Sequence, residues 1–321
     1  MRRALVVALV CWASFACGAP QPLPGMDQLR SAEFELGQQS YARAQEHAEA
    51  ALEDDVVKEL SPAEQAEAHW VAGEAAFAQG RHLKAFRHYK SLLETAHASP
   101  RLVAVEDRLF ELGEIYLFDD EYGGWFDSRA RGVEVLETLQ IHYAQSDQAD
   151  DALRRIGEYF ASDDVQNWRE AALTYEQLFR EYPTSEWAER SLWLAGHYRL
   201  RLVPGPRYNQ AELLRAQELL RLSLREHPRG VAVHDARADL AAAREMMAES
   251  EVMIADFYAA RDRDFGEQLK LANAALLYPD TRAGQQALER LAALGLDLQA
   301  LGVARFNSLD KAVAPRSAWD Q

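Results

Sequence analysis

Basic residues are scarce in this chain. Its 321 residues carry 35 Lys and Arg against 51 Asp and Glu, which gives a formal net charge of −16. Proteins that bind nucleic acid gather Lys and Arg against the phosphates, and no basic stripe of that kind occurs along the sequence. We therefore expect no nucleic-acid partner, and we expect an acidic surface that favours solubility and avoids anionic surfaces.

Strand signals are also few. Runs of Val, Ile and Thr that alternate with polar residues are nearly absent, whereas Ala, Leu, Glu, Gln and Arg dominate many segments. These five residue types are strong helix formers. Hydrophobic residues make up 48% of the chain, which is enough to bury a core. The composition therefore predicts an all-α protein.

Long apolar runs are missing everywhere except at the N-terminus. Met1-Arg2-Arg3 is a short basic segment, and the apolar stretch from Ala4 to Ala16 that follows it is too short to span a bilayer comfortably. A basic start followed by a short apolar run is typical of a secretory signal peptide. We therefore expect residues 1–16 to be a cleaved signal peptide.

Cysteine occurs only twice, at Cys11 inside the expected signal and at Cys17 directly after it. The stretch Ser14-Phe15-Ala16-Cys17 resembles the lipobox of bacterial lipoproteins, although that family prefers Leu where Ser14 stands. The resemblance implies that Cys17 becomes the N-terminal residue and carries lipid such as palmitate, and that Gly18, which is not Asp, directs the protein to the outer membrane. The alternative is an ordinary signal peptide that leaves a free thiol. Residues 17–28 are rich in Pro and Gly and are expected to form a flexible tether.

Motifs for catalysis and for metal or cofactor binding are not found. The nine His residues form no His-Glu-x-x-His pattern, and no pair of Cys offers a zinc site. The chain has no Gly-x-Ser-x-Gly, and Tyr122-Gly123-Gly124 lacks the Lys-Ser/Thr of a phosphate-binding loop. We therefore expect no catalytic residue, no metal and no cofactor.

A motif that ends one helix and starts the next recurs at intervals of roughly 40 to 50 residues, and such a period is typical of helical repeats. Tyr182-Pro183-Thr184-Ser185 and Tyr278-Pro279-Asp280-Thr281 each follow an apolar helical stripe, and weaker versions occur at His227-Pro228 and at Tyr143. Pro cannot continue a helix, so Pro183 ends one. Ser185 or Thr184 is then expected to cap the first helix of the next pair.

Residues 62–100 show the repeat most clearly. Ser61-Pro62-Ala63-Glu64 is a helix start, with Ser as the N-cap and Glu three residues later. Gly80 is expected to end this helix near Gln79, before a second helix that includes Ala85 and Tyr89. Gly73, Gly80, Ala85 and Tyr89 stand where tetratricopeptide repeats place a small residue, a turn residue, a small residue and an aromatic. Small residues let paired helices approach closely, and the aromatic is expected to fill the groove between this pair and the next.

Five further segments fit the same layout, so the sequence predicts six helix pairs, five of them regular. They are residues 27–54, 101–143, 149–183, 186–228 and 235–279. A single pair cannot cover its apolar stripe alone, so the pairs are expected to stack. The fold class predicted is therefore all-α, with five to six tetratricopeptide-like helix-pair repeats stacked into a superhelical domain over residues 29–295.

Two connections are longer than the rest. Residues 119–126 separate the helices of the third pair and include Trp125 and Phe126, and residues 203–209 separate those of the fifth and include Tyr208. Long aromatic loops in helical repeats often carry function, so these three side chains are candidate binding residues. The alternative is that Trp125 and Phe126 only fill space inside the superhelix. Residues 296–321 lose periodicity and are expected to be a tail, or a short capping helix around Phe306 and Leu309.

The order of these features resembles the BamD (YfiO) family of outer-membrane assembly lipoproteins. The resemblance rests on Cys17, on residues 148–159 with their Ala-Asp-Asp-Ala helix start, on residues 175–185, and on residues 248–258 followed by 278–281. It covers roughly residues 100–292, while residues 27–99 are more generic. No residue-level binding motif is available to transfer beyond Cys17.

The resemblance implies a non-enzymatic scaffold on the periplasmic side of the outer membrane, lipid-anchored in a Gram-negative-type bacterium. Its partners would be the outer-membrane barrel-assembly protein and unfolded β-barrel precursors. An alternative is another tetratricopeptide lipoprotein that scaffolds cell-wall or division proteins. A peptidoglycan-cleaving enzyme is the least favoured hypothesis, because Glu158 and Glu251 lie within repeat helices and no second domain remains to hold a catalytic Glu.

Overall fold

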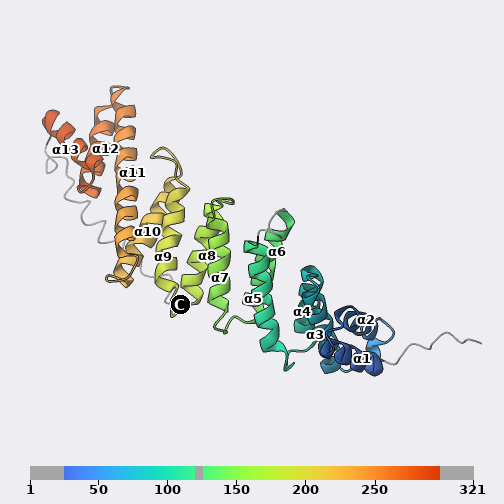
Figure 1. Cartoon of the computed structure of the whole chain (residues 1–321). Coiled ribbons are helices and arrows are strands. Elements are labelled where there is room, and N and C mark those ends of the chain that lie inside the picture. Colours follow the sequence, from blue (N-terminus) through green and yellow to red (C-terminus); the bar gives the residue numbers. More distant parts are fainter. Residues whose placement is uncertain (1–24, 120–125, 297–321) are drawn as a thin grey trace, which may run out of the picture. The chain divides into compact units, whose positions relative to one another are not determined.

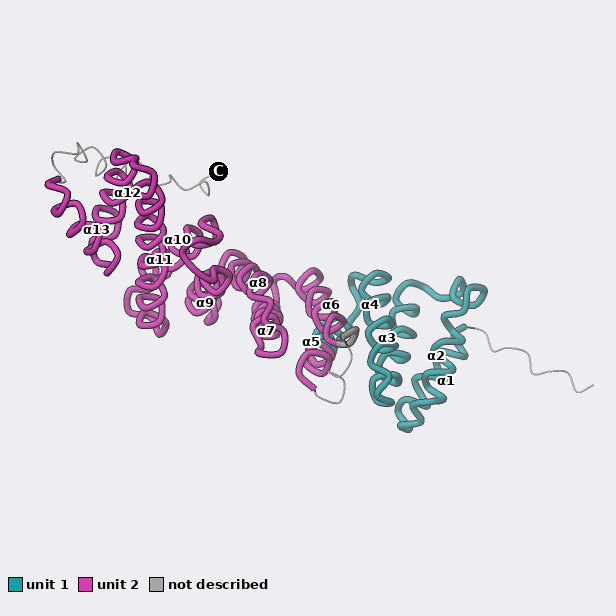
Figure 2. Tube along the Cα trace, turned by 90° about the horizontal axis from the view of Figure 1, so that it is seen from above, with its two compact units in different colours: residues 1–109 teal, residues 110–321 magenta. Residues whose placement is uncertain are grey.

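The computed structural model describes residues 25–119 and 126–296, and within them every regular element is a helix (Figure 1). Thirteen α-helices and one short 3-10 helix are found there. The all-α prediction is therefore confirmed. The chain divides into two compact units, residues 1–109 and residues 110–321, which are coloured separately in Figure 2. Each unit is described by itself below.

The first unit holds α1 to α4 and the beginning of α5. Their bounds are Gly25–Gly37 for α1, Tyr41–Ala51 for α2, Pro62–Ala78 for α3, His82–Thr95 for α4 and Leu102–Phe118 for α5, with the 3-10 helix η1 at Val57–Glu59. Helix α2 packs on α1 and on α3, and α4 packs on α3. The turns within the pairs α1–α2 and α3–α4 are short, so the two helices of each pair run antiparallel.

The second unit holds the rest of α5 and helices α6 to α13. Their bounds are Phe126–His142 for α6, Ala149–Ala161 for α7, Trp168–Glu181 for α8, Ala188–Arg201 for α9, Gln210–Glu226 for α10, Val233–Ala259 for α11, Asp264–Leu277 for α12 and Arg282–Ala293 for α13. Each of these helices packs on the next one in the sequence, from α6 on α7 to α12 on α13. The odd-numbered helices also touch one another, α9 on α11 and α11 on α13. The predicted helix-pair repeats are therefore present.

Small residues bring the helices of a pair together, as the sequence predicts. A Cβ added to Gly73 would lie 2.5 Å from a ring carbon of Tyr89, so α3 and α4 meet at a distance that only Gly permits. The same relation holds between Gly157 on α7 and Tyr175 on α8, where the added Cβ would lie 2.8 Å from the phenol ring. Tyr89 and Tyr175 are both buried. Each aromatic ring thus fills the space that its glycine leaves.

The helix starts agree with the prediction at one repeat and differ at another. Ser61 accepts a hydrogen bond from the Glu64 amide at 3.4 Å, and the Glu64 carboxylate accepts one from the Ser61 amide at 2.7 Å, so the predicted capping box is confirmed. Helix α9 instead starts after Trp187, which makes no side-chain cap. Ser185 Oγ accepts from the Trp187 amide at 3.0 Å and shapes the turn before the helix, so the prediction that Ser185 or Thr184 caps α9 was wrong. The Ser hydroxyl bonds two residues ahead, before helical geometry begins.

Three boundaries differ from the expected ones. Helix α1 begins at Gly25, so the last residues of the expected tether are helical. Helix α13 follows the sixth pair and was not anticipated, although Thr281 caps it by accepting a hydrogen bond from the Gly284 amide at 3.0 Å. Residues 29–295, which were expected to form one domain, divide between two compact units. A repeat array allows this division because its contacts run only between neighbouring pairs.

Several expectations fall on residues that the structure does not describe. The signal peptide, Cys17, Trp125 and the suggested capping helix around Phe306 and Leu309 all lie outside the described ranges. Among the helices that are described, none combines the length and the apolar character needed to cross a membrane.

Candidate functional site

Polar contacts join the first helices of successive pairs in the second unit. Arg155 on α7 donates to Glu114 on α5, and Ser185, just before α9, donates to Asp150 on α7. The next step uses Asp239 on α11, which accepts hydrogen bonds from Trp193 and His197 of α9 at 2.8 and 3.0 Å. These contacts line up the odd-numbered helices along one face of the unit.

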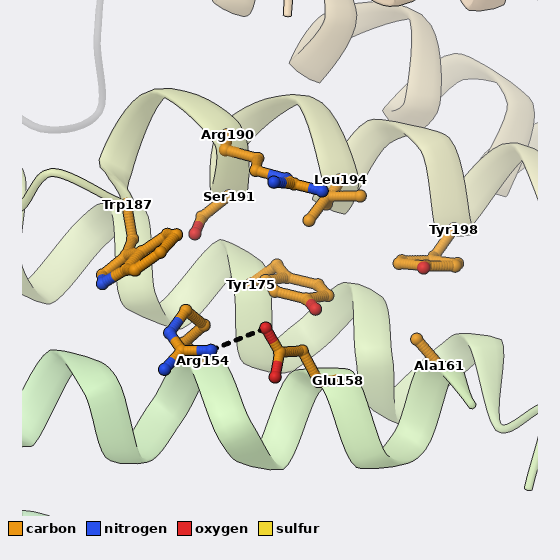
Figure 3. A pocket seen from close by; sticks show the side chains of 9 residues that line it. All are labelled: Arg154, Glu158, Ala161, Tyr175, Trp187, Arg190, Ser191, Leu194 and Tyr198. Carbon is orange, nitrogen blue, oxygen red and sulfur yellow. Dashed lines mark hydrogen bonds and ion pairs between the residues drawn. The ribbon is translucent and has the colours of Figure 1, made fainter.

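A cavity of about 220 Å³ opens on this face between α7 and α9 (Figure 3). Tyr175 of α8 lies between the two helices, and Figure 3 shows Trp187 and Tyr198 at opposite ends of the cavity. The complete lining is Arg154, Glu158, Ala161, Tyr175, Trp187, Arg190, Ser191, Leu194 and Tyr198. The site therefore combines three aromatic rings with two arginines and one carboxylate.

Helix α9 supplies one wall because it carries two stripes. Leu192, Ala195 and Gly196 are buried and pack toward the core. Trp187, Ser191, Leu194 and Tyr198 follow one another at steps of three or four residues, so they share a second face of the same helix. That second face, shown along the upper edge of the cavity in Figure 3, meets α7.

An ion-pair cluster on α7 forms the opposite wall. Arg154 donates to Asp151 at 3.0 Å and to Glu158 at 2.7 Å, and Arg155 also donates to Glu158 at 2.7 Å. The Arg154 guanidinium lies 4.5 Å from the ring centroid of Trp187, which is cation–π distance. Burial opposes the charge of Arg154, but the hydrogen bonds that it donates to Glu158 and Asp151 outweigh this effect and leave its pKa raised. Both Arg154 and Glu158 therefore have partners within the protein.

Stacked rings hold the aromatic end of the cavity in place. The ring of Tyr198 is stacked on that of Trp168, with centroids 5.5 Å apart and planes 3° apart. It also stacks on Tyr175, with centroids 5.8 Å apart and planes 15° apart. Arg201 adds a guanidinium 4.9 Å from the centroid of Trp168. Because each ring is held by the next, this end of the cavity is organised before any ligand arrives.

Two polar groups at the cavity have no partner among the described residues. The ring of Tyr175 is buried, with the residue only 3% exposed, but its hydroxyl oxygen remains accessible at the cavity and makes no hydrogen bond to a described residue. Burial first, then the nearby charges of Tyr198 and Glu158, raise the pKa of this phenol, so it keeps its proton at neutral pH. Arg190 is exposed on the rim and makes no ion pair in the described part of the chain. These two groups are free to bind something else.

The aromatic rings and charged side chains of this lining can recognise a ligand. No group of three or more His, Cys, Asp or Glu side chains that could hold a metal ion occurs among the described residues. A second hollow, lined by Gly230, Val231, Val233, His234, Arg237 and Ala238 at the start of α11, is more open and contains no aromatic ring apart from the His imidazole. The cavity between α7 and α9 is therefore the better candidate for binding.

The residues proposed from sequence lie elsewhere. Tyr208 is 59% exposed in the connection between α9 and α10 and does not line the cavity. Phe126 begins α6, and its side chain, like Trp125 and Cys17, is outside what the structure describes. The sequence analysis missed the cavity residues Trp187, Arg190 and Tyr198. The sequence pattern that could have identified them is the second row of side chains on α9, spaced three or four residues apart. This row can be recognised only after the buried row that packs into the core has been assigned.

Comparison with known proteins gives a family match over more than half of the chain. Residues 123–306 match the family YfiO, described as "Outer membrane lipoprotein". The match includes α7, α8 and α9 and therefore the whole cavity.

Two further proteins are similar to this chain. The outer membrane protein assembly factor BamD of Pasteurella multocida is 24% identical over 196 residues, which is 57% of this chain and 71% of that protein. The solved C-terminal part of a TPR repeat-containing protein from Cytophaga hutchinsonii covers 82% of this chain and 87% of its own, with 12% identity and a TM-score of 0.31. A TM-score at that level supports no argument about function.

Proposed function

The chain belongs to the YfiO family of outer membrane lipoproteins, and from this membership we propose that it is a non-enzymatic scaffold of the outer-membrane β-barrel assembly machinery. In this role it faces the periplasm and binds the barrel-assembly protein and unfolded β-barrel precursors. The observation that carries the proposal is the family match across residues 123–306, supported by the similarity to a BamD assembly factor.

The architecture suits a scaffold. Stacked helix pairs present long side-chain surfaces that bind other proteins, and the backbone polar groups of each helix are satisfied internally. The odd-numbered helices of the second unit share one face, and the cavity between α7 and α9 opens on it. Its aromatic rings and arginine are residue types that are enriched in the centres of protein interfaces.

Attachment to the membrane is assigned to Cys17 in this proposal. A lipid on its thiol and a second on its amine would supply two anchors, which stable membrane binding requires. The Cys17→Ala variant is then expected to appear in the wash when membranes are treated with high salt, whereas the wild-type chain stays bound. A Cys17→Ala chain that remains on the membrane after the wash would contradict this assignment.

The partner is tested by co-purification. The chain, tagged at its C-terminus, is recovered from membranes in mild detergent, and the bound proteins are identified by mass spectrometry. We expect the barrel-assembly protein to be the most abundant partner, and depletion of the chain to lower the amount of folded barrel proteins in the outer membrane. Recovery of cell-wall or division proteins in its place would reject the assembly role and favour a different lipoprotein scaffold.

A further inference from the structure

We propose that the cavity between α7 and α9 binds an extended peptide segment through one aromatic side chain and a carboxylate two residues away. The inference deepens the proposed function, because it names the chemistry of the segment that the scaffold would recognise. It rests on the size of the cavity, its stacked rings, the exposed Arg190 and the Tyr175 hydroxyl, which is accessible at the cavity and makes no hydrogen bond to a described residue.

The volume selects a single large side chain. The cavity measures about 220 Å³. A cavity of about 150 Å³ already accepts benzene, so one phenyl or phenol ring fits here and a folded element does not. Trp187 and Tyr198 at its two ends, with Leu194 between them and Ala161 near Tyr198, give the ring apolar and aromatic neighbours (Figure 3). Aromatic pairs gain energy beyond simple burial, which favours an aromatic ring over an aliphatic side chain.

The charge on the rim selects a carboxylate. Arg154 is satisfied by Asp151 and Glu158, so its charge is already balanced inside the protein. Arg190 has no such partner among the described residues and lies on the same cavity. A guanidinium next to a partly dry surface binds carboxylates through paired hydrogen bonds, and it is repelled by ligand cations. The ligand therefore carries an acidic group on the Arg190 side.

The distance between the two ligand groups follows from the geometry of an extended chain. Neighbouring side chains of an extended segment point to opposite sides, whereas side chains two positions apart lie on the same side about 7 Å from each other. An aromatic ring in the cavity and a carboxylate at the rim must both face the protein. The acidic residue thus stands two positions from the aromatic one.

Tyr175 provides a contact to the ligand backbone. Its ring packs against Gly157 and stacks on Tyr198, which fixes where the hydroxyl lies. The hydroxyl is accessible at the cavity and makes no hydrogen bond to a described residue, so a peptide carbonyl that enters the cavity can accept one from it. A tyrosine phenol is protonated at neutral pH, and burial raises the pKa of Tyr175 further, so it acts as the donor.

The first experiment measures peptide binding to the purified mature chain by fluorescence anisotropy. The probe is Gly-Ser-Asp-Ser-Phe-Ser-Gly with blocked termini and a dye on an added linker, so no terminal charge contributes. Peptides with Asn for Asp, Ala for Phe, or Lys for Asp are the comparison set. We expect binding to weaken roughly 10-fold with Asn, as for the loss of one charge-assisted pair, and more with Lys. Removal of the ring is expected to weaken it roughly 30-fold.

Variants of the protein then assign each preference to a side chain. Arg190→Gln should abolish the difference between the Asp and Asn peptides while the Phe peptide still binds better than the Ala peptide. Ala161→Leu places a side chain inside the cavity and should weaken all peptides that contain Phe. Arg225→Gln is the matched control, because the Arg225 side chain is 72% exposed, pairs with Glu226 on the same helix α10 and does not line the cavity, so the variant should change nothing.

The outcomes are decisive in both directions. Equal binding of the Asp and Asn peptides, or an Arg190→Gln variant that keeps the preference for Asp, overturns the assignment of Arg190. Undiminished binding to Ala161→Leu, or no measurable binding of the first probe, overturns the cavity as the site. The co-purification experiment is independent of these measurements. A chain that binds the Asp-Ser-Phe peptide but recovers no barrel-assembly protein would keep this inference and reject the proposed function.

Discussion

Arg199 holds three helices of the second unit together, and its replacement tests how much that contact stabilises. Its guanidinium donates to Glu212 of α10 at 2.7 Å and to Glu176 of α8 at 2.9 Å, and its side chain is only 13% exposed. Arg199 follows Tyr198 in the chain, so the contact also fixes one end of the cavity. The perturbation is Arg199→Met, which keeps most of the side-chain length and removes the charge.

The expected loss can be worked out from the contacts. Two hydrogen bonds to charged groups, at the low end of their range, amount to about 3 kcal/mol. The carboxylates are not left bare, because Glu176 keeps Arg215 and Glu212 keeps Arg169. The Nε of Arg199 is buried without a partner in the described structure, and its removal returns about 1 kcal/mol. The net destabilisation expected is about 2 kcal/mol.

Amide hydrogen exchange in native conditions is the assay, because it reports the local opening of α8, α9 and α10 separately from the rest of a repeat array. A change of about 2 kcal/mol corresponds to roughly 30-fold faster exchange in these helices. The control is Arg169→Met, whose side chain is 54% exposed and which makes a single bond to Glu212. An exposed pair contributes less than about 1 kcal/mol, so the control should change exchange only a few-fold.

The effect should also depend on pH. Burial raises the pKa of Glu176, but hydrogen bonds from Arg215 and Arg199 outweigh it and leave the pKa below 4.5. A lowered carboxyl pKa contributes stability that is complete above the unfolded pKa and is lost as the pH falls through the folded one. The difference between wild type and Arg199→Met should therefore shrink below about pH 4.5. Exchange within twofold of wild type at pH 7, or equal effects of the two variants, would refute the reasoning.

Three other predictions concern single residues. Burial, then the charge of His88, lowers the pKa of His69 to about 4. The first unit should therefore lose about 3 kcal/mol of stability as the pH falls from 6.5 toward 4, which thermal melts at several pH values would measure. The His69→Gln variant should remove most of this pH dependence. Gly157→Ala should push the Tyr175 ring toward the cavity and weaken Phe-peptide binding at least 10-fold by anisotropy, because the added Cβ lies 2.8 Å from the ring; unchanged binding would contradict this. If residues 296–321 include a capping helix, Leu288→Ala should destabilise by about 2 kcal/mol in denaturant titration, although Leu288 is 48% exposed on the described surface; no change would argue against a cap there.

Much of the fold could be predicted because its signals are local. Ser61 and Glu64 form their capping box within four residues, and Gly80 ends α3 with a positive φ of 69° that glycine adopts without strain. The small residue Gly73 on one helix and the large aromatic Tyr89 on the next predict that the two helices pack closely. Helix α13 was missed because its stripe of Ala283, Ala287 and Leu291 is made mainly of small residues, which carry a weak hydrophobic signal.

The cavity was harder to predict, since its parts are distant in the sequence. Arg154 and Trp187 stand on different helix pairs, and nothing local tells that their side chains will meet at 4.5 Å. Tyr208 drew attention because exposed aromatic loops are conspicuous in a sequence, yet it lies away from the cavity. The stripe that does line the cavity has the same spacing as a core stripe, so periodicity alone cannot separate a binding face from a packing face.

The sequence by itself determined that the chain is helical and where most pairs begin and end, because caps, turns and helix propensity act over a few residues. Only the tertiary structure decided which arginines are neutralised and which remain available. Arg199 and Arg190 look alike in the sequence, but packing brings Glu176 of α8 and Glu212 of α10 to Arg199 and leaves Arg190 at the rim of the cavity. The physical reason is that charge pairing between helices depends on how the pairs stack, which is a property of distances between segments and not of any one segment.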